Sequence, residues 1–197
     1  MVVALGIDEE GKKHILGLWE GATENAAVCK SLLMDLVDRG LCVDAGILVI
    51  IDGSKALRSA VRNVFGKQAV VQRCQVHKLC NVLDHLPEQE RTWVERKIKD
   101  AWRQKDADKA LRALKRLANQ LEEGYPGAVA SLREGMEETL TVIHLGLPEL
   151  LQMSLWSTNA IESAFKTVRD VSSGGKTTKF FVGWLPVFWR QRPAFEG

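Results

Sequence analysis

The feature that most restricts the fold is the segment ILVIIDGS at 47–54, in which an unbroken apolar run leads directly into a carboxylate and a turn. Such a run is typical of a strand that is covered on both faces. Gly53 and Ser54 favour a turn after Asp52, and the Ser54 hydroxyl can cap a following helix. The inward positions of that helix are Leu57, Ala60, Val61, Val64 and Phe65. A buried strand, a tight turn and a covering helix together predict an α/β fold.

Other segments before residue 78 add to this sheet. Residues 2–7 and 14–19 flank the polar stretch DEEGKK, which predicts a β-hairpin. Thr23 can cap a helix over 23–39, and Gly40 is a typical stop signal for it. A further strand is predicted over 69–74. We therefore expect a mixed sheet with flanking helices.

The second half of the chain has a different pattern. From residue 78 to about 151 no strand is predicted; the charged stretch 91–124 has apolar residues at helical spacing, and a helix is expected over 128–139. An amphipathic helix is predicted over 157–171, opening with a Ser/Thr/Asn cluster. Residues 172–197 show neither helical nor strand periodicity, so we expect no further strand and a divergent tail.

Composition excludes several classes of protein. The net charge of +2 is too small to indicate a nucleic-acid partner by itself. The longest apolar run, 45–51, is far shorter than the roughly 20 residues of a membrane span. The N-terminus has no basic region of a signal peptide, and the four scattered cysteines are typical of reduced thiols. We expect a cytoplasmic protein without a membrane partner.

Asp52 and Glu162 are the carboxylates that suggest chemistry. Ligands of open α/β sheets bind beyond the carboxyl ends of strands, where Asp52 stands, and carboxylate oxygen suits a hard divalent cation. The alternative is that Asp52 only makes a turn. Glu162 lies on the predicted helix 157–171, beside its buried face, where a solvated helix residue is the alternative. Two such carboxylates are typical of a two-metal phosphoryl-transfer site, which normally uses a third.

Between them lies the pattern C-x2-H-x2-C-x4-H, formed by Cys74, His77, Cys80 and His85. It permits a zinc site, although structural zinc sites usually bring together two separate ligand pairs. The alternative, which we prefer, is that Cys74 packs as a small apolar residue and that His77 stands at the strand end near the carboxylates.

Four segments taken in order resemble the Mutator-type transposases of bacterial insertion sequences. They are VVALGIDEEGKKHILGLWEGATEN at 2–25, IDGSKALRSAV at 51–61, QRCQVHKLCNVLDHLP at 72–87 and STNAIESAFKTVR at 157–169. One motif alone would be a weak signal, whereas the ordered set spans roughly residues 1–171 and is specific.

The resemblance implies a ribonuclease-H-like catalytic core with three acidic residues and an all-helical insertion. Asp52 would be the second acid and Glu162 the third, together holding Mg²⁺ (or Mn²⁺). Residues 1–77 would form the first part of the core, 78–155 the insertion and 156–171 the helix of the third acid, with 172–197 as the tail. The implied function is DNA cleavage and strand transfer at the terminal repeats of the element.

The resemblance also suggests supporting and DNA-binding residues. Cys74, His77 and Asn159 would support the site. Trp93 and Trp102 are candidates for stacking on DNA bases, with a place in the helix core as the alternative. The candidate phosphate contacts are Arg96, Lys97, Arg103, Lys166 and Arg169.

The chain also departs from the family pattern. The first acid would fall on a strand before Met1, and Asp8 is a poor substitute because it sits in the predicted hairpin turn. We therefore expect a truncated and catalytically defective copy, which is nucleoid-associated and forms a homo-oligomer or binds full-length transposase. The alternative is a non-catalytic DNA-binding protein that interferes with the full-length enzyme.

Overall fold

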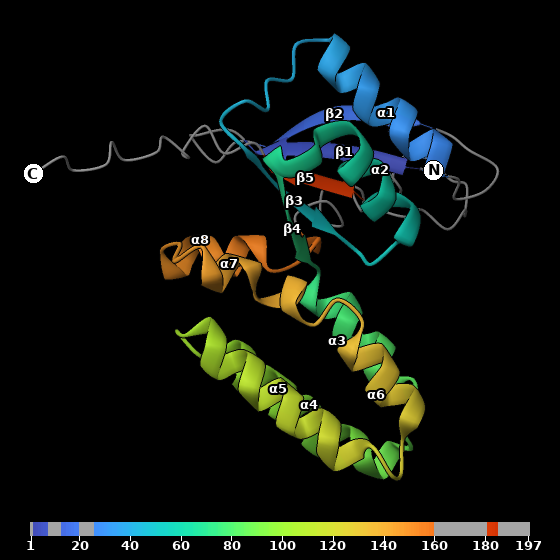
Figure 1. The fold of residues 1–197 in the computed structure, drawn as a ribbon, viewed down its shortest axis with the longest axis vertical. Coiled ribbons are helices and arrows are strands. Elements are labelled where there is room, and N and C mark those ends of the chain that lie inside the picture. Colours follow the sequence, from blue (N-terminus) through green and yellow to red (C-terminus); the bar gives the residue numbers. More distant parts are fainter. Residues whose placement is uncertain (1, 8–12, 20–25, 160–180, 185–197) are drawn as a thin grey trace, which may run out of the picture. The chain divides into compact units, whose positions relative to one another are not determined.

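The computed structural model describes residues 2–7, 13–19, 26–159 and 181–184. These residues divide into two compact units. The sheet unit takes its residues from Met1–Val71 and Asn159–Gly197, and the helical unit is Gln72–Thr158. Each unit is described by itself below, and the elements of both are labelled in Figure 1.

The sheet unit contains a five-stranded sheet in the order β2-β1-β5-β3-β4. Strand β1 (Val2–Ile7) pairs antiparallel with β2 (Lys13–Trp19), as the predicted hairpin requires. Strand β3 (Ile47–Ile51) is buried along its whole length. Strand β4 (Ala69–Arg73) begins in the sheet unit, and its last two residues belong to the helical unit. The fold is thus mixed α/β, as predicted.

The position of β5 (Phe181–Trp184) corrects one prediction. We expected no strand beyond residue 74, yet β5 lies between β1 and β3, parallel to β1 and antiparallel to β3. The segment has only four residues and contains Gly183, so it lacks the length and the alternation by which strands are recognised in a sequence. The predicted strands at 2–7, 47–51 and 69–74 are confirmed with small shifts of their ends.

Two helices cover one face of this sheet (Figure 1). Helix α1 (Ala26–Asp38) ends just before Gly40, the predicted stop signal, whose positive φ of 100° favours glycine. The amide of Gly40 donates to Val37 and that of Leu41 to Leu36, which is the Schellman pattern of a helix end. Helix α2 (Lys55–Phe65) begins after Ser54, whose hydroxyl accepts the Leu57 amide. The buried cluster between helices and sheet contains Val2, Ala4, Cys29, Leu32, Leu33, Leu36, Ile47, Val49, Ile51, Leu57, Ala60, Val61 and Phe65.

The described part of the helical unit beyond β4 contains helices only. Helix α3 (Gln75–Leu83) follows β4 directly and lies beside α6 (Pro126–Arg133). Helices α4 (Glu88–Trp102) and α5 (Ala107–Leu121) are neighbours, so the charged stretch 91–124 forms two helices rather than one. Asp106 separates them because its carboxylate caps α5 by accepting the Lys109 amide.

The predicted helix over 128–139 is wrong in its extent. Helix α6 begins at Pro126, in the first turn where proline is favoured, and ends at Arg133. Gly135 then turns the chain with a φ of 64°, which stops the helix. A 3-10 turn (Glu137–Leu140), α7 (Thr141–His144) and α8 (Glu149–Leu155) complete the unit.

Candidate functional site

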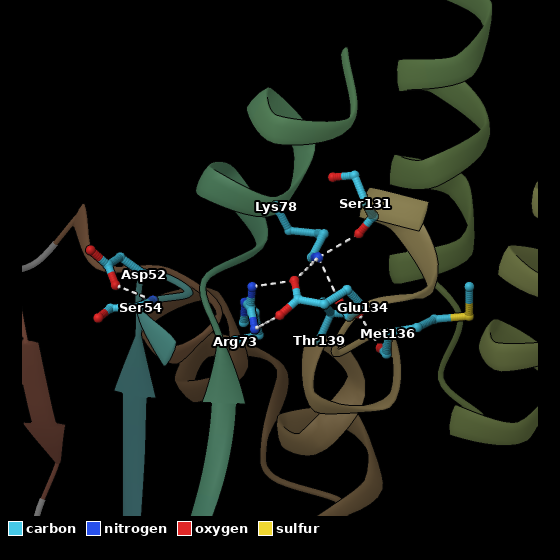
Figure 2. A network of polar contacts seen from close by, with 8 residues as sticks. All are labelled: Asp52, Ser54, Arg73, Lys78, Ser131, Glu134, Met136 and Thr139. Atoms are coloured by element: carbon cyan, nitrogen blue, oxygen red, sulfur yellow. Dashed lines mark hydrogen bonds and ion pairs between the residues drawn. The ribbon is translucent and has the colours of Figure 1, made fainter. Parts of the chain in front are cut away.

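Asp52 stands at the carboxyl end of β3, as the sequence predicts. Its Oδ1 accepts the backbone amide of Ser54 at 2.9 Å, which fixes the carboxylate in an Asx turn (Figure 2). Gly53 makes this turn possible because its φ of 117° is a conformation that other residues rarely adopt. The carboxylate is half-buried, and within the described residues its Oδ2 accepts no hydrogen bond. Asp52 thus presents one oxygen in a fixed orientation.

Glu162 lies outside the described residues, as do Lys166 and Arg169. Most of the predicted helix 157–171 lies outside them too. Asn159 is described and exposed. The meeting of Asp52 and Glu162 in one cleft therefore stays a prediction.

Cys74 and His77, the two residues of the C-x2-H motif, contact each other in the helical unit. Nδ1 of His77 lies 3.2 Å from Sγ of Cys74. Thr158 completes the cluster, because its amide and its hydroxyl each donate to Cys74 Sγ at 3.4 Å. Cys74 is fully buried, and His77 lies in the first turn of α3 rather than at the end of the strand, because α3 starts at Gln75.

These contacts change the acidity of Cys74. Burial raises the pKa of the thiol, but hydrogen bonds from His77 and Thr158 act against burial and together outweigh it. The net result is a pKa below the ordinary value of a cysteine. Sequence reasoning predicted a small apolar role for Cys74; the geometry adds a polar one, because the sulfur is a hydrogen-bond acceptor.

The four residues of the possible zinc pattern are all described. Among the described residues, no group of three or more His, Cys, Asp or Glu side chains has a geometry that could hold a metal ion. Cys80 is exposed on α3, and the His85 ring lies against Gly127. Cys74, His77, Cys80 and His85 therefore do not form a zinc site in this conformation.

A network that the sequence did not reveal surrounds the carboxylate of Glu134 (Figure 2). The guanidinium of Arg73 donates two hydrogen bonds to it, at 3.1 and 2.6 Å. The ammonium of Lys78 donates to the same carboxylate at 3.2 Å and to the carbonyl of Ser131 at 2.6 Å. Arg73 and Lys78 are buried, whereas Glu134 reaches the surface.

Burial and neighbouring charges shift the pKa values of Glu134 and Lys78. Burial raises the pKa of Glu134, but the two cations outweigh burial and bring it below its ordinary value. The pKa of Lys78 is lowered, first by burial and then by the neighbouring charge of Arg73. Because 61 and 56 residues separate Glu134 from Arg73 and Lys78, no local spacing could have predicted the network.

Trp102 and Trp93, the two candidates for base stacking, have different surroundings. Trp102 is buried, and its indole nitrogen donates to the Thr139 hydroxyl at 3.1 Å, which fits the helix-core alternative. Trp93 is half-buried, and its indole nitrogen donates to Glu90 on the preceding turn of α4. The stacking role of these tryptophans stays a prediction.

The candidate phosphate contacts on α4 are exposed. Within the described residues, Arg96 and Lys97 form no ion pair. Arg103 pairs with Asp100 at 3.2 Å, three residues earlier. Exposed cations without an acidic partner are the ones most available to an anionic ligand.

Comparison with known proteins identifies the family. The family model described as "Transposase, Mutator family" matches residues 1–175, which include Asp52, the Cys74–His77 pair and Glu162. The chain belongs to this family. The matched region of this Mutator-family chain ends before β5, so the strand in the middle of its sheet lies outside the match.

Similar transposases occur in several bacteria. The chain is 32% identical over 169 residues to the transposase for insertion sequence element IST2 of Acidithiobacillus ferrooxidans, covering 86% of this chain and 56% of that protein. It is 34% identical over 169 residues to the IS6120 transposase of Mycolicibacterium smegmatis, covering 86% and 51%. The Mutator-family chain thus spans about half the length of these relatives. No helix in its described segments has the length and apolar character needed to cross a membrane.

Proposed function

We propose that this Mutator-family chain carries two acids of a metal-dependent DDE transposase site. Asp52 would be the second acid and Glu162 the third. The observation that supports this most strongly is the carboxylate of Asp52, which is held at the carboxyl end of the buried strand β3 with one oxygen free of hydrogen bonds among the described residues. An oxygen donor in a fixed turn suits Mg²⁺ or Mn²⁺.

The proposal extends to the architecture. The sheet unit would be a ribonuclease-H-like core, and residues 78–155 an all-helical insertion between the second and third acids. Support comes from the hairpin, from the buried strand β3 beside β4, and from the helices that follow β4 as far as Leu155.

The proposed chemistry is strand cleavage and transfer at the ends of an insertion sequence. A pair of bound Mg²⁺ ions would supply activation of the attacking oxygen and stabilisation of the leaving oxygen. Asp52 would contribute an anionic ligand, and the Asx turn with Ser54 would keep that ligand oriented before metal arrives. Glu162 would contribute a second anionic ligand.

The test is titration of the chain with Mn²⁺ by calorimetry. Asp52→Asn is the informative variant, because the asparagine carbonyl can still accept the Ser54 amide while the charge is removed. We expect Asp52→Asn and Glu162→Gln each to weaken Mn²⁺ binding by about tenfold or more, since loss of a mere hydrogen-bond partner of a metal ligand already costs about that much. The control is Asp100→Asn, which removes an exposed carboxylate on α4. Equal Mn²⁺ affinity in the unmodified chain and Asp52→Asn would refute the proposal.

Cleavage is tested separately on supercoiled DNA with Mg²⁺. Nicking that disappears in Asp52→Asn would support the proposed catalytic role of Asp52, and nicking that Asp52→Asn leaves unchanged would contradict it.

A second candidate function is non-catalytic DNA binding that interferes with full-length transposase. The exposed cations Arg96 and Lys97 on α4 favour it. If they contact phosphates, replacing both by alanine should reduce the slope of log K against log salt by about 0.9 per contact. The matched control replaces Lys99 and Arg133, which carry the same charge but pair with Glu95 and Glu122. A gel shift that is equally weakened by both double variants, or absent at low salt, would contradict specific contacts at Arg96 and Lys97.

A further inference from the structure

Hydrogen bonds connect the first and last segments of the helical unit. Cys74 follows β4 at the start of the unit, and Thr158 is its last residue. The amide and hydroxyl of Thr158 donate to the Cys74 sulfur, across 84 residues of sequence. The next residue, Gln75, donates its amide to the carbonyl of Trp156 at 2.9 Å. The two chain ends are therefore joined by side-chain and backbone hydrogen bonds.

The surroundings of the Cys74 sulfur favour a negative charge. Two donors of Thr158 and Nδ1 of His77 lie within 3.4 Å of it. Cys74 is also the N-cap residue of α3, a nine-residue helix whose first amides carry partial positive charge. A thiolate at a helix N-terminus beside a histidine is a stabilised state of cysteine.

His77 is well placed to hold the proton that the sulfur gives up. Its Nδ1 lies 3.2 Å from Cys74 Sγ and 3.3 Å from the hydroxyl oxygen of Thr158. An Nδ1–H can donate to either atom, while the Thr158 hydroxyl donates to the sulfur. This arrangement links Nδ1 of His77, the sulfur of Cys74 and the hydroxyl of Thr158.

We propose that Cys74 is a thiolate paired with the His77 imidazolium, and that the pair and Thr158 form a clasp that fixes where the chain leaves the helical unit. Glu162 follows Thr158 by four residues. The clasp would therefore fix the starting point of the segment that carries Glu162, a consequence that depends on the proposed function. Cys74, His77 and Thr158 are then positioning residues, and none of them needs to touch DNA or metal.

The experiment uses the full chain with three variants. Cys74→Ser keeps a hydrogen-bonding side chain but cannot form an anion at neutral pH, and His77→Gln keeps a donor but removes the positive charge. The matched control is Cys80→Ser, which changes an exposed cysteine on the same helix. The first measurement is ultraviolet thiolate absorbance at neutral pH, which a merely structural role for Cys74 would not produce. The second is amide hydrogen exchange at 156–158, with α5 as the internal reference.

We expect thiolate absorbance in the unmodified chain and in Cys80→Ser, a reduced signal in His77→Gln and none from this site in Cys74→Ser. Exchange at 156–158 should be about tenfold faster or more in Cys74→Ser and His77→Gln, since a hydrogen bond to a charged group is lost, and unchanged in α5.

An unmodified chain whose absorbance equals that of Cys74→Ser would overturn the thiolate. Unchanged exchange at 156–158 in Cys74→Ser would overturn the clasp. If Cys74→Ser does not fold, His77→Gln decides both points. Neither measurement involves metal or DNA, so failure here is distinct from failure of the metal site in the Mn²⁺ titration.

Discussion

Replacing Glu134 by glutamine should destabilise the helical unit through the two buried cations that share this carboxylate. In the native chain Arg73 and Lys78 both donate to Glu134, and their side chains are only 4% and 1% exposed. Glutamine has nearly the same shape, but it is neutral and offers one oxygen instead of two. The variant therefore leaves two buried cations without their shared anion.

The magnitude follows from the contacts that disappear. Breaking a fully buried ion pair costs about 3–5 kcal/mol. That figure is an upper limit here, because the Glu134 side chain is 41% exposed and water screens its charge. The glutamine oxygen also keeps one hydrogen bond, and Lys78 keeps the carbonyl of Ser131. We expect a loss of about 2 kcal/mol in the free energy of unfolding, the scale of one hydrogen bond to a charged group.

The assay is urea unfolding followed by far-ultraviolet circular dichroism, with Glu122→Gln as the matched control. Glu122 also forms a two-point ion pair with an arginine, Arg133, but both side chains are about half exposed. Because exposed pairs contribute little, Glu122→Gln should leave the urea midpoint nearly unchanged. Equal midpoints for the two variants would refute the argument that burial of Arg73 and Lys78 gives Glu134 its importance.

Three further predictions concern pH, a buried hydroxyl and the central strand. The pKa of Glu134 is lowered on folding, so its contribution to the free energy of unfolding is complete above the ordinary glutamate pKa of about 4.3 and is lost as pH falls through the folded value. The difference in stability between the native chain and Glu134→Gln should therefore narrow below about pH 4. A difference that stays constant with pH would contradict this. Thr139→Val leaves the buried Trp102 indole N–H without its acceptor and should cost about 1–3 kcal/mol in urea unfolding, whereas Thr139→Ser should cost clearly less. Gly183→Pro removes a backbone donor from β5, opposite Val49, and should speed amide exchange in β3 but not in α5; unchanged exchange in β3 would contradict the strand order.

Local sequence patterns predicted the elements whose signals are local. The apolar run at 47–51 with Asp52, Gly53 and Ser54 gave a strand, a turn and a capped helix in the right places, because each step depends on neighbouring residues. Gly40 likewise marked the end of α1 through its backbone conformation. Strand β5 was missed because its pairing with β1 and β3 comes from distant parts of the chain, and its four residues carry no periodicity of their own.

In the candidate site, too, features with a local sequence signal could be predicted and features set by distant residues could not. The place of Asp52 at the end of a buried strand could be predicted, since the carboxylate follows the strand directly. The contact of Cys74 with His77 follows from their spacing across the first turn of α3. The third member, Thr158, could not be predicted, because packing of the whole helical unit brings it to the sulfur. The same holds for Glu134, whose charge is needed only because two cations are buried beside it.

The late position of β5 in the chain affects how the sheet folds while the chain is being synthesised. The ribosome synthesises β1 through β4 and the whole helical unit before it reaches residue 181. At roughly 5–20 residues per second, the interval between β3 and β5 is on the order of ten seconds. During this time the edges of β1 and β3 that later pair with β5 lack their final partner, while the helical unit can already fold. During this interval the unpaired edges of β1 and β3 are open to edge-to-edge association with other chains.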